Sequence, residues 1–318
     1  MTRLVFVLFV AFGGIAALLA QAPATIVPQP LWTVNTGLMR PNSAYYHQQS
    51  NSIFVSNHSG GRFNKDGNGY ITRLAPDGKV LAEKWATGLS APKGIRSVGS
   101  TIWVVDIGEI VGFEFTAAGA RTRSRVRIDG APGLHDLATA PDGTIFVSQA
   151  CRYPPSPDCP PRIYMIKDGQ PSIFVEGDDA GWLPIGLLVD GARLIVGTVG
   201  RGTGKDARIQ GAQLVAFDLE TGARTVLATT MVVGQVGGIE PAEPGAYFVG
   251  DLLSRRLVHV DSDGKITTLA RFEHGGGHIA VSPAAKQLQQ AGTLFVPFPN
   301  ADSVSAYDLS TLIRAATN

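Results

Sequence analysis

Six short apolar runs recur along the chain at a nearly constant spacing. Each run is rich in β-branched and aromatic residues and is bounded by turn-forming residues, which is typical of a strand buried on both faces. Counted from the second residue of each run, positions 53, 102, 145, 194, 247 and 294 lie 49, 43, 49, 53 and 47 apart. A period of about 40 to 50 residues indicates a radial or solenoidal array of repeated units. The runs cover 52–57, 101–106, 144–149, 193–198, 246–251 and 293–298.

Each apolar run is predicted to be the second strand of a four-stranded unit. In the third unit, strands are expected over 133–138, 144–149, 162–166 and 171–175. Short turns such as Pro76-Asp77-Gly78 separate the third and fourth strands, and their residues are typical of β-hairpin turns. Six such units predict an all-β fold, a six-bladed β-propeller of four-stranded antiparallel blades.

The two ends of the chain are expected to close the ring. The last unit has a third strand over 304–309, but only a polar and partly helical tail follows it. Its missing outer strand is predicted to come from residues 31–34, which resemble the fourth strands of other units. Closure in this way removes open sheet edges and makes residues 23–318 one domain.

Composition supports a turn-rich β protein. The 318 residues include 38 Gly and 20 Pro, and only 17% of them are charged. The formal net charge is +1, so the chain lacks the concentrated basic face that binding to nucleic acid requires.

The first 22 residues form a separate segment, with Arg3 followed by an almost wholly apolar run. This pattern predicts a secretory signal peptide that is cleaved near Ala20 or Ala22, giving a periplasmic or secreted protein with no membrane attachment after cleavage. A retained anchor is the alternative, because the run approaches the length needed to span a membrane and Pro23 hinders cleavage immediately before it.

Two cysteines, Cys151 and Cys159, lie in one loop. In an exported protein they are predicted to form a local disulfide. A metal-binding pair is the weaker interpretation, since no His flanks either thiol.

The strand order of a blade predicts which side chains share one mouth of the central channel. The starts of the first strands and the ends of the second strands should meet there. The first-strand positions step by 51, 42, 50, 52 and 41, so they follow the repeat: Asn42, Lys93, His135, Ile185, Gly237 and His278. The second-strand ends contribute Asn57, Asp106, Gln149 and Asp251 as candidate substrate-binding residues.

Three long loops, 58–69, 150–161 and 199–211, are expected to roof this mouth. They carry Arg62, Arg152 and Arg201, so the roof is locally basic although the whole chain is nearly neutral. Arginine clusters recognise carboxylates, which predicts a carboxylate-bearing small-molecule ligand. The alternative is that these are solvated surface charges.

Several motifs resemble the senescence-marker protein/gluconolactonase/luciferin-regenerating-enzyme family of six-bladed propellers. They are PNSAYY at 41–46, IFVSN at 53–57, KDGNGYI at 65–71, LAPDGK at 74–79, APKG at 91–94 and GLLVDG at 186–191. The resemblance spans about residues 31 to 309. It implies hydrolysis of lactones or esters at a divalent cation, usually calcium, which the family holds in the channel through Glu, Asn and Asp.

The family's ligand positions have changed in this chain. The resemblance places the Glu at Asn42, two Asn at His135 and Ile185, the Asp at Gly237, and a further acidic position at His278. No carboxylate remains at any of these positions. Calcium prefers several oxygen ligands with negative charge among them, so the family's calcium site is predicted to be lost and the cofactor is unknown.

A histidine-based site is one interpretation of these changes. Blades 3 and 6 face each other, so His135 and His278 should approach across the channel, where either imidazole could act as a general base. Asp136 or Asp106 would fix its tautomer, and Lys93 would stabilise an oxyanion. A second interpretation adds His274 to these two imidazoles as a zinc or copper site. In a third, each imidazole is a hydrogen-bonded structural residue.

Two functions follow, and the sequence leaves both open. The first is an exported hydrolase of the lactonase or esterase type that uses His135, His278 and Lys93. The second is a non-catalytic propeller that binds an anionic small molecule or a protein partner, because the fold hosts both kinds of function. A cofactor-dependent oxidoreductase is disfavoured, since the sequence has no dinucleotide-binding fingerprint.

Overall fold

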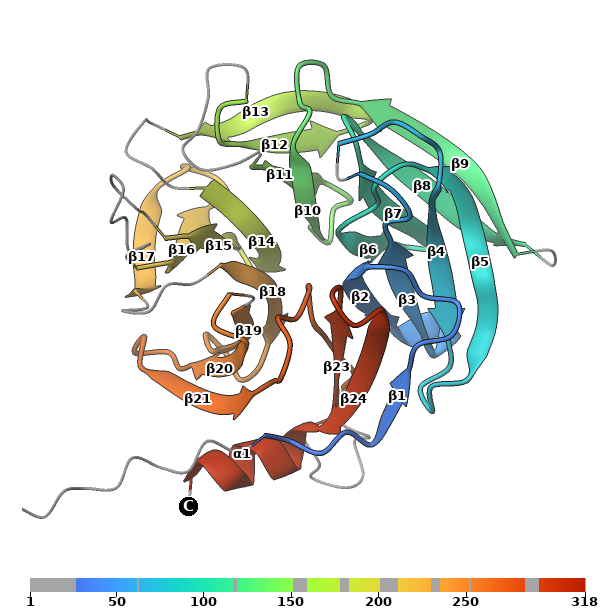
Figure 1. Cartoon of the computed structure of the whole chain (residues 1–318). Coiled ribbons are helices and arrows are strands. Elements are labelled where there is room, and N and C mark those ends of the chain that lie inside the picture. Colours follow the sequence, from blue (N-terminus) through green and yellow to red (C-terminus); the bar gives the residue numbers. More distant parts are fainter. Residues whose placement is uncertain are drawn as a thin grey trace, which may run out of the picture.

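Six antiparallel sheets surround a common axis in the computed structural model (Figure 1). The structure describes residues 27–61, 63–116, 119–150, 159–177, 183–200, 211–229, 235–251, 253–283 and 292–317. Each sheet has four strands, so the prediction of a six-bladed β-propeller with four-stranded blades is confirmed.

Consecutive strands fill each blade from the axis outward. Blade 1 holds β2 (Pro41–His47), β3 (Ser52–Asn57), β4 (Gly69–Leu74) and β5 (Val80–Leu89), and blade 2 holds β6 (Ile95–Val98), β7 (Thr101–Asp106), β8 (Glu109–Thr116) and β9 (Gly119–Arg127). Blade 3 holds β10 (Leu134–Thr139), β11 (Ile145–Gln149), β12 (Arg162–Lys167) and β13 (Gln170–Glu176), and blade 4 holds β14 (Leu183–Asp190), β15 (Arg193–Val199), β16 (Gln213–Asp218) and β17 (Arg224–Thr229). Blade 5 holds β18 (Val236–Pro241), β19 (Tyr247–Asp251), β20 (Arg256–Val260) and β21 (Ile266–Arg271).

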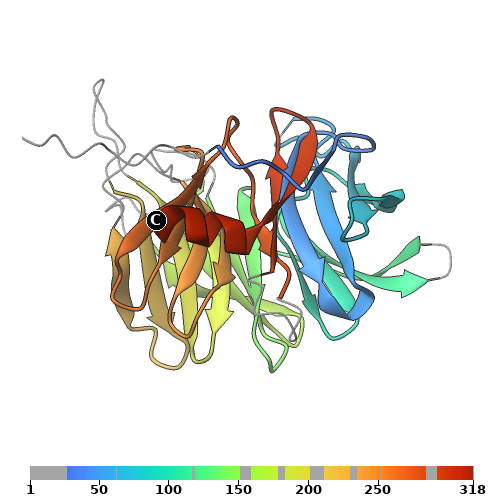
Figure 2. The same ribbon diagram turned by 90° about the horizontal axis from the view of Figure 1, so that it is seen from below.

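Blade 6 combines both ends of the described chain. Its inner strands are β22 (Ala280–Val281), β23 (Thr293–Phe298) and β24 (Ser303–Asp308), and its outer strand is β1 (Trp32–Val34), which pairs with β24. The Trp32 indole donates a hydrogen bond to the Pro76 carbonyl and lies against Phe295, with ring centroids 5.8 Å apart. The predicted ring closure is therefore confirmed. Helix α1 (Leu309–Thr317) follows β24 and lies along the outside of the ring beside β21 (Figure 2).

The core lies between neighbouring blades. The second strands carry most of it: β3 and β11, for example, are buried along their whole length. Between blades 1 and 2, Phe54 lies 4.7 Å from Trp85 in a cluster that also includes Ile102 and Val104. Because each blade covers its neighbour in this way, the first strands are held at the axis by buried apolar surface.

Three glycines allow the first strands to approach one another closely at the axis. A Cβ atom on Gly186 would collide with the Gly237 carbonyl, one on Gly238 would collide with the Ile279 amide, and one on Gly94 would collide with the Asp136 side chain. These glycines lie one position after the predicted mouth residues. The channel is therefore too narrow for a side chain at those three points.

Several predictions concern residues outside the described ranges. The proposed signal peptide at 1–22, the roof residues Arg62, Arg152 and Arg201, and Cys151 all belong to this group. Cys159 is described and buried, but its predicted disulfide with Cys151 stays a prediction. Among the described helices, none has the length and apolar character required to cross a membrane.

Candidate functional site

Four of the six first-strand residues predicted at the mouth line a cavity of about 420 Å³, here called the upper pocket, whereas Gly237 and His278 are absent from its lining. Asn42, Lys93, His135 and Ile185 line it, each at the start of a different inner strand or directly before one. The lining also includes His58, Phe63, Gln235 and Asn300, which the sequence interpretation had not selected for the site. Four blades therefore contribute first-strand residues to one pocket, as the repeat spacing predicts.

His135 and His278 come together at the inner end of this pocket. Their ring centroids are 5.1 Å apart, although blades 3 and 6 are on opposite sides of the ring. His135 lines the pocket, whereas His278 is fully buried. The backbone holds His278 in place, since its amide donates to the Asn42 carbonyl (2.8 Å) and its carbonyl accepts from the Ala44 amide (2.9 Å).

Asp136 forms a buried ion-pair contact with His278. The distance from His278 Nδ1 to Asp136 Oδ2 is 3.2 Å, and both side chains are fully buried. The contact has the distance of an ion pair but lacks the direction of a good hydrogen bond, so the attraction is mainly electrostatic. Asp136 Oδ2 also accepts a hydrogen bond of 2.9 Å from the Leu187 amide of blade 4.

The Asp136 carboxylate is stabilised in its ionised form. Burial on its own would raise the pKa of Asp136, but the charges of His278 and Arg96 and the hydrogen bond from the Leu187 amide hold that pKa below its usual range. Asp136 therefore supplies a fixed negative charge beside the imidazole of His278.

A second buried pair crosses the channel from blade 2 to blade 5. Arg96 Nη2 lies 3.4 Å from Glu240 Oε1, and the two side chains are 9% and 14% exposed. Burial raises the pKa of Glu240 to about 7, because the attraction of Arg96 only partly offsets the desolvation and Asp136 adds repulsion. Arg96 also donates to the carbonyl of Ile95 and lies 5.7 Å from the Tyr45 ring centroid.

The sequence interpretation missed this second pair, although the repeat contains a signal for it. Adding three to each first-strand position gives a ring with the same steps of 51, 42, 50, 52 and 41: Tyr45, Arg96, Ala138, Leu188, Glu240 and Val281. In a regular strand, the side chains at i and i+2 point to the same side. Bulges add one residue to four of the first strands, so that in these strands the residue at i+3 takes the place of the residue at i+2. Counting one layer further along each strand would have brought Arg96 and Glu240 together.

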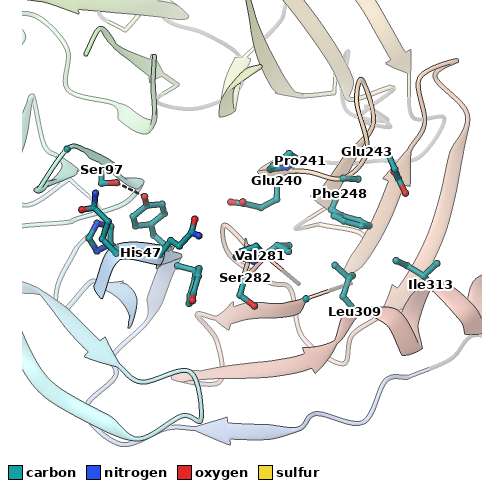
Figure 3. Close-up of a pocket in the computed structure, with 18 residues that line it drawn as sticks. His47, Ser97, Glu240, Pro241, Glu243, Phe248, Val281, Ser282, Leu309 and Ile313 are labelled. Atoms are coloured by element: carbon teal, nitrogen blue, oxygen red, sulfur yellow. Dashed lines mark hydrogen bonds between the residues drawn. The ribbon is translucent and has the colours of Figure 1, made fainter. Parts of the chain in front are cut away.

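The two pairs separate the channel into two cavities. A second cavity of about 710 Å³, here called the lower pocket, opens at the other mouth and shares no lining residue with the upper pocket (Figure 3). Glu240 lines the lower pocket and His135 lines the upper one. His278 and Asp136 are buried and line neither cavity.

Lys93 lies in the wall of the upper pocket. Its side chain is 5% exposed, its ammonium donates a 2.9 Å hydrogen bond to the Leu134 carbonyl, and it lies 5.9 Å from the Phe63 ring centroid. Asp106, which the sequence suggested as a residue that orients an imidazole, accepts hydrogen bonds from the amides of Ser90 and Ala91.

The four second-strand ends are not brought into the lining of the upper pocket. Each side chain is buried and contacts nearby chain instead. Asn57 accepts from the Met39 amide, Gln149 donates to the Pro160 carbonyl, and Asp251 accepts from the Gln235 amide and pairs with Arg256. Together with Asp106, these residues attach loops to the top of the second strands, which differs from the substrate contact that we predicted.

The structure does not assemble the proposed zinc or copper triad. His274 lines a separate surface pocket beside Phe298 and is absent from the lining of the upper pocket. In the part of the chain that the structure describes, no group of three or more His, Cys, Asp or Glu side chains is arranged to hold a metal ion.

Calcium does not suit the donors at the family's ligand positions either. Asn42 Oδ1 is a buried oxygen without a hydrogen-bond partner among the described residues, so it is available as a ligand atom. The other positions offer the imidazoles of His135 and His278, the apolar Ile185, and Gly237. Calcium prefers six to eight oxygen ligands with carboxylates among them, which this set does not supply.

No protein-family model matches the sequence, and no curated protein matches it either. Solved structures do match the fold. A gluconolactonase from Xanthomonas campestris is 17% identical, with a TM-score of 0.59 over 89% of this chain and 88% of its own. The calcium-binding protein regucalcin from Agrobacterium tumefaciens is 13% identical, with a TM-score of 0.62 over 88% of this chain and 93% of its own.

A third similar structure is a catalytically inactive histidine-to-alanine variant of virginiamycin B lyase from Staphylococcus aureus, with quinupristin. It is 12% identical, with a TM-score of 0.53 over 86% of this chain and 97% of its own. The chain therefore has the propeller fold of gluconolactonase-like and regucalcin-like proteins, and at these identities the similarity concerns the fold alone.

Proposed function

We propose that the chain is a hydrolase of lactones or esters that acts in the upper pocket with His135 as the general base. The observation that carries the proposal is the placement of His135 on the pocket wall, with its ring centroid 5.1 Å from that of His278, which in turn contacts the buried Asp136. An imidazole in a pocket, backed by a fixed carboxylate charge, is the arrangement that general-base catalysis uses near neutral pH.

The reaction requires one proton acceptor and one group that stabilises an oxyanion. His135 takes a proton from water while the water oxygen bonds to the carbonyl carbon. The Lys93 ammonium stabilises the negative charge on the carbonyl oxygen. When the carbon–oxygen bond to the alcohol breaks, His135 returns the proton to the departing oxygen. A lactone then gives a hydroxy acid, whose carboxyl group loses its proton to solvent and remains beside Lys93 as a carboxylate.

His278 and Asp136 are positioning residues in this proposal. Because His278 is fully buried, it does not reach a ligand in the upper pocket, and it differs in this respect from the base that the sequence suggested. Its ring supports that of His135, and the Asp136 charge stabilises the positive charge that His135 gains during the reaction.

The substrate class follows from the charge of the upper pocket. The described lining contains the Lys93 cation and no carboxylate, and the Asn42 oxygen is available to accept a hydrogen bond from a substrate hydroxyl. We therefore favour a lactone or ester that carries hydroxyl groups or a carboxylate. Arg62, Arg152 and Arg201 would add to this preference if their loops cover the mouth. The sequence pattern at 1–22 supports export as part of the same proposal.

Two of the similar structures support enzymatic use of this fold. One is described as a gluconolactonase, and the other is a lyase that a histidine-to-alanine change makes inactive. Histidine-dependent chemistry in a propeller therefore has a precedent, although the sequence identity is too low to transfer either reaction.

The test is hydrolysis of a panel of lactones and aryl esters by the mature protein. We expect turnover of at least one member and a fall in kcat of about 10² to 10⁴ in His135→Ala. His259→Ala is the matched control, because His259 lies in an outer strand and pairs with Glu243. Asp136→Asn should lower kcat and shift its pH profile, while a purely structural role would change only stability.

Absence of turnover across the panel, or full activity in His135→Ala, would reject the hydrolase. The second candidate, a non-catalytic binding propeller, would then be favoured, because the lining offers an ammonium and an unpaired amide oxygen without needing chemistry. It predicts that hydroxy acids raise the Tm of the parent protein and that Lys93→Met removes this effect.

A further inference from the structure

The lower pocket has a chemical character opposite to that of the upper pocket. Its volume of about 710 Å³ is in the range of cavities that hold small molecules. Tyr45, Tyr46 and Phe248 supply aromatic surface, and Glu240 and Glu243 supply carboxylates. The described lining contains neither Lys nor Arg. A ligand that fits this hollow would combine an apolar or aromatic body with positive charge.

Glu240 lies at the inner end of the lower pocket. Figure 3 shows its carboxylate directed into the hollow, toward the wall formed by Ser97. On that wall the Tyr45 hydroxyl and Ser97 Oγ are 2.7 Å apart and hydrogen-bonded to each other. Glu243, by contrast, is at the rim with its side chain 68% exposed and pairs with His259. The two carboxylates are therefore not equivalent, and only Glu240 is well shielded from water.

A second buried group in the lower pocket has unused hydrogen-bonding capacity. His47 lines the pocket and is 4% exposed, and its Nδ1 is 2.9 Å from Ser50 Oγ. Its Nε2 has no hydrogen-bond partner among the described residues. Burial and the charge of Arg73 lower the pKa of His47, so the ring is neutral and adds no repulsion toward a cation. In the tautomer whose Nδ1 donates to Ser50 Oγ, Nε2 is the acceptor that a ligand N–H group requires.

We propose that the lower pocket is a binding site for a small organic cation, with its ammonium group against Glu240 and its apolar body against Tyr45, Tyr46 and Phe248. Aromatic faces and a shielded carboxylate are the two features that proteins use to bind such cations. The site is independent of the proposed hydrolase, since the two pockets share no lining residue.

Binding should strengthen as the pH rises from 6 to 8. The groups that face Glu240 are Arg96 from β6, Asp136 from β10, the Tyr45 ring from β2 and the backbone of Val281 from β22. His278 lies behind Asp136. Because the pKa of Glu240 is about 7, the carboxylate is largely protonated at pH 6 and largely ionised at pH 8.

The probe is benzylammonium, compared with benzyl alcohol and benzoate in NMR titrations of the full mature protein at pH 6 and pH 8. At pH 8 we expect benzylammonium to bind at least ten-fold more tightly than either of the other two. Glu240→Gln should remove this preference. Gln49→Lys, at an exposed position on the pocket rim, should weaken benzylammonium binding without altering the buried network.

Glu243→Gln is the matched control and should bind benzylammonium like the parent protein. Equal binding by parent and Glu240→Gln, equal binding of the three probes, or no binding of benzylammonium at either pH would each overturn the proposal. If Glu240→Gln fails to fold, the loss of affinity in Gln49→Lys and the pH dependence of the parent protein decide the question. Hydrolase activity does not enter any of these readouts.

Discussion

Glu240 shows how the channel sets the chemistry of a single residue. Its carboxylate is 14% exposed and has one guanidinium nearby, at a distance longer than that of a tight pair. Burial therefore outweighs the attraction, and the pKa is raised to about 7. The same type of side chain at Glu243, in the next turn, is mostly exposed.

The raised pKa of Glu240 predicts that the free energy of unfolding depends on pH. The folded state holds the proton more tightly than the unfolded state, whose pKa is near 4.5. The stabilisation from this group is therefore complete below pH 4.5 and is lost as the pH rises through about 7. A pKa difference of this size corresponds to at most about 3 to 4 kcal/mol. We expect the Tm of the parent protein to fall more steeply between pH 5 and pH 8 than the Tm of Glu240→Gln.

Calorimetric melts at several pH values would measure this effect, with Glu243→Gln as the control that retains the slope of the parent. Asp136 acts in the opposite direction, because its pKa is lowered and its contribution is lost only in acid, below the pH range of the experiment. Parallel Tm profiles for the parent protein and Glu240→Gln would contradict the raised pKa.

The sequence predicted part of the site at the level of single residues. Asn42, Lys93 and His135 were found because the repeat spacing fixes which residue starts each inner strand. Asp106 and Asp251 were placed at the correct mouth, but spacing alone does not reveal that a short polar side chain folds back onto nearby amides. Arg96 was missed because only the first layer of the inner strands was counted, and bulges in four of these strands move the next layer to position i+3, where Arg96 and Glu240 lie.

The inner strands are the elements on which the site depends most. They approach one another so closely that Gly186 has no room for a Cβ atom against the Gly237 carbonyl. The contact is to backbone, which can move only if blades 4 and 5 separate. Since the same strands carry the pocket residues, their spacing also sets the geometry of the site.

Gly186→Ala is therefore predicted to destabilise the protein by several kcal/mol or to prevent folding. Gly250→Ala is the matched control, because its Cβ would lie 3.2 Å from the Ile279 Cγ2 atom, a side-chain atom that can shift. We expect about 1 kcal/mol for that change. Urea denaturation followed by fluorescence measures the free energy of unfolding of both variants. Equal stabilities would contradict the close backbone contact between Gly186 and Gly237.

Strands and turns were predicted correctly where the local sequence pattern favours the same structure that the six-bladed ring requires. The hairpin at Pro76-Asp77-Gly78 joins β4 to β5 as expected, and Gly78 has the positive φ (87°) that such a turn requires. The short β22 was less visible in the sequence. It begins two residues after His278. His278 forms a parallel bridge with Ser43 of blade 1, in place of backbone pairing with β23 of its own blade.

At the scale of the whole molecule, closure of the ring depends on three residues near the beginning of the described chain. Strand β1 pairs with β24 and covers an edge that would otherwise be open. Deleting residues 27–36 is expected to lower the Tm by more than 10 °C and to cause association through the exposed edge of β24.

Thermal melts combined with light scattering at two protein concentrations test this prediction. Trp32→Ala keeps the strand and removes the packing of the indole on Phe295 and its neighbours and the hydrogen bond to Pro76, so it should cost about 2 to 3 kcal/mol without causing association. A deletion variant that melts like the parent protein and stays monomeric would show that the ring closes without β1.

The two buried pairs also constrain how this propeller changes over evolutionary time. Each pair joins blades on opposite sides of the ring, Arg96 with Glu240 and Asp136 with His278. Losing one member leaves an uncompensated charge in the interior, so a change in one blade favours a compensating change in the blade opposite. In descendants of this chain, substitutions should therefore be correlated between distant repeats at these positions, even where neighbouring repeats diverge independently.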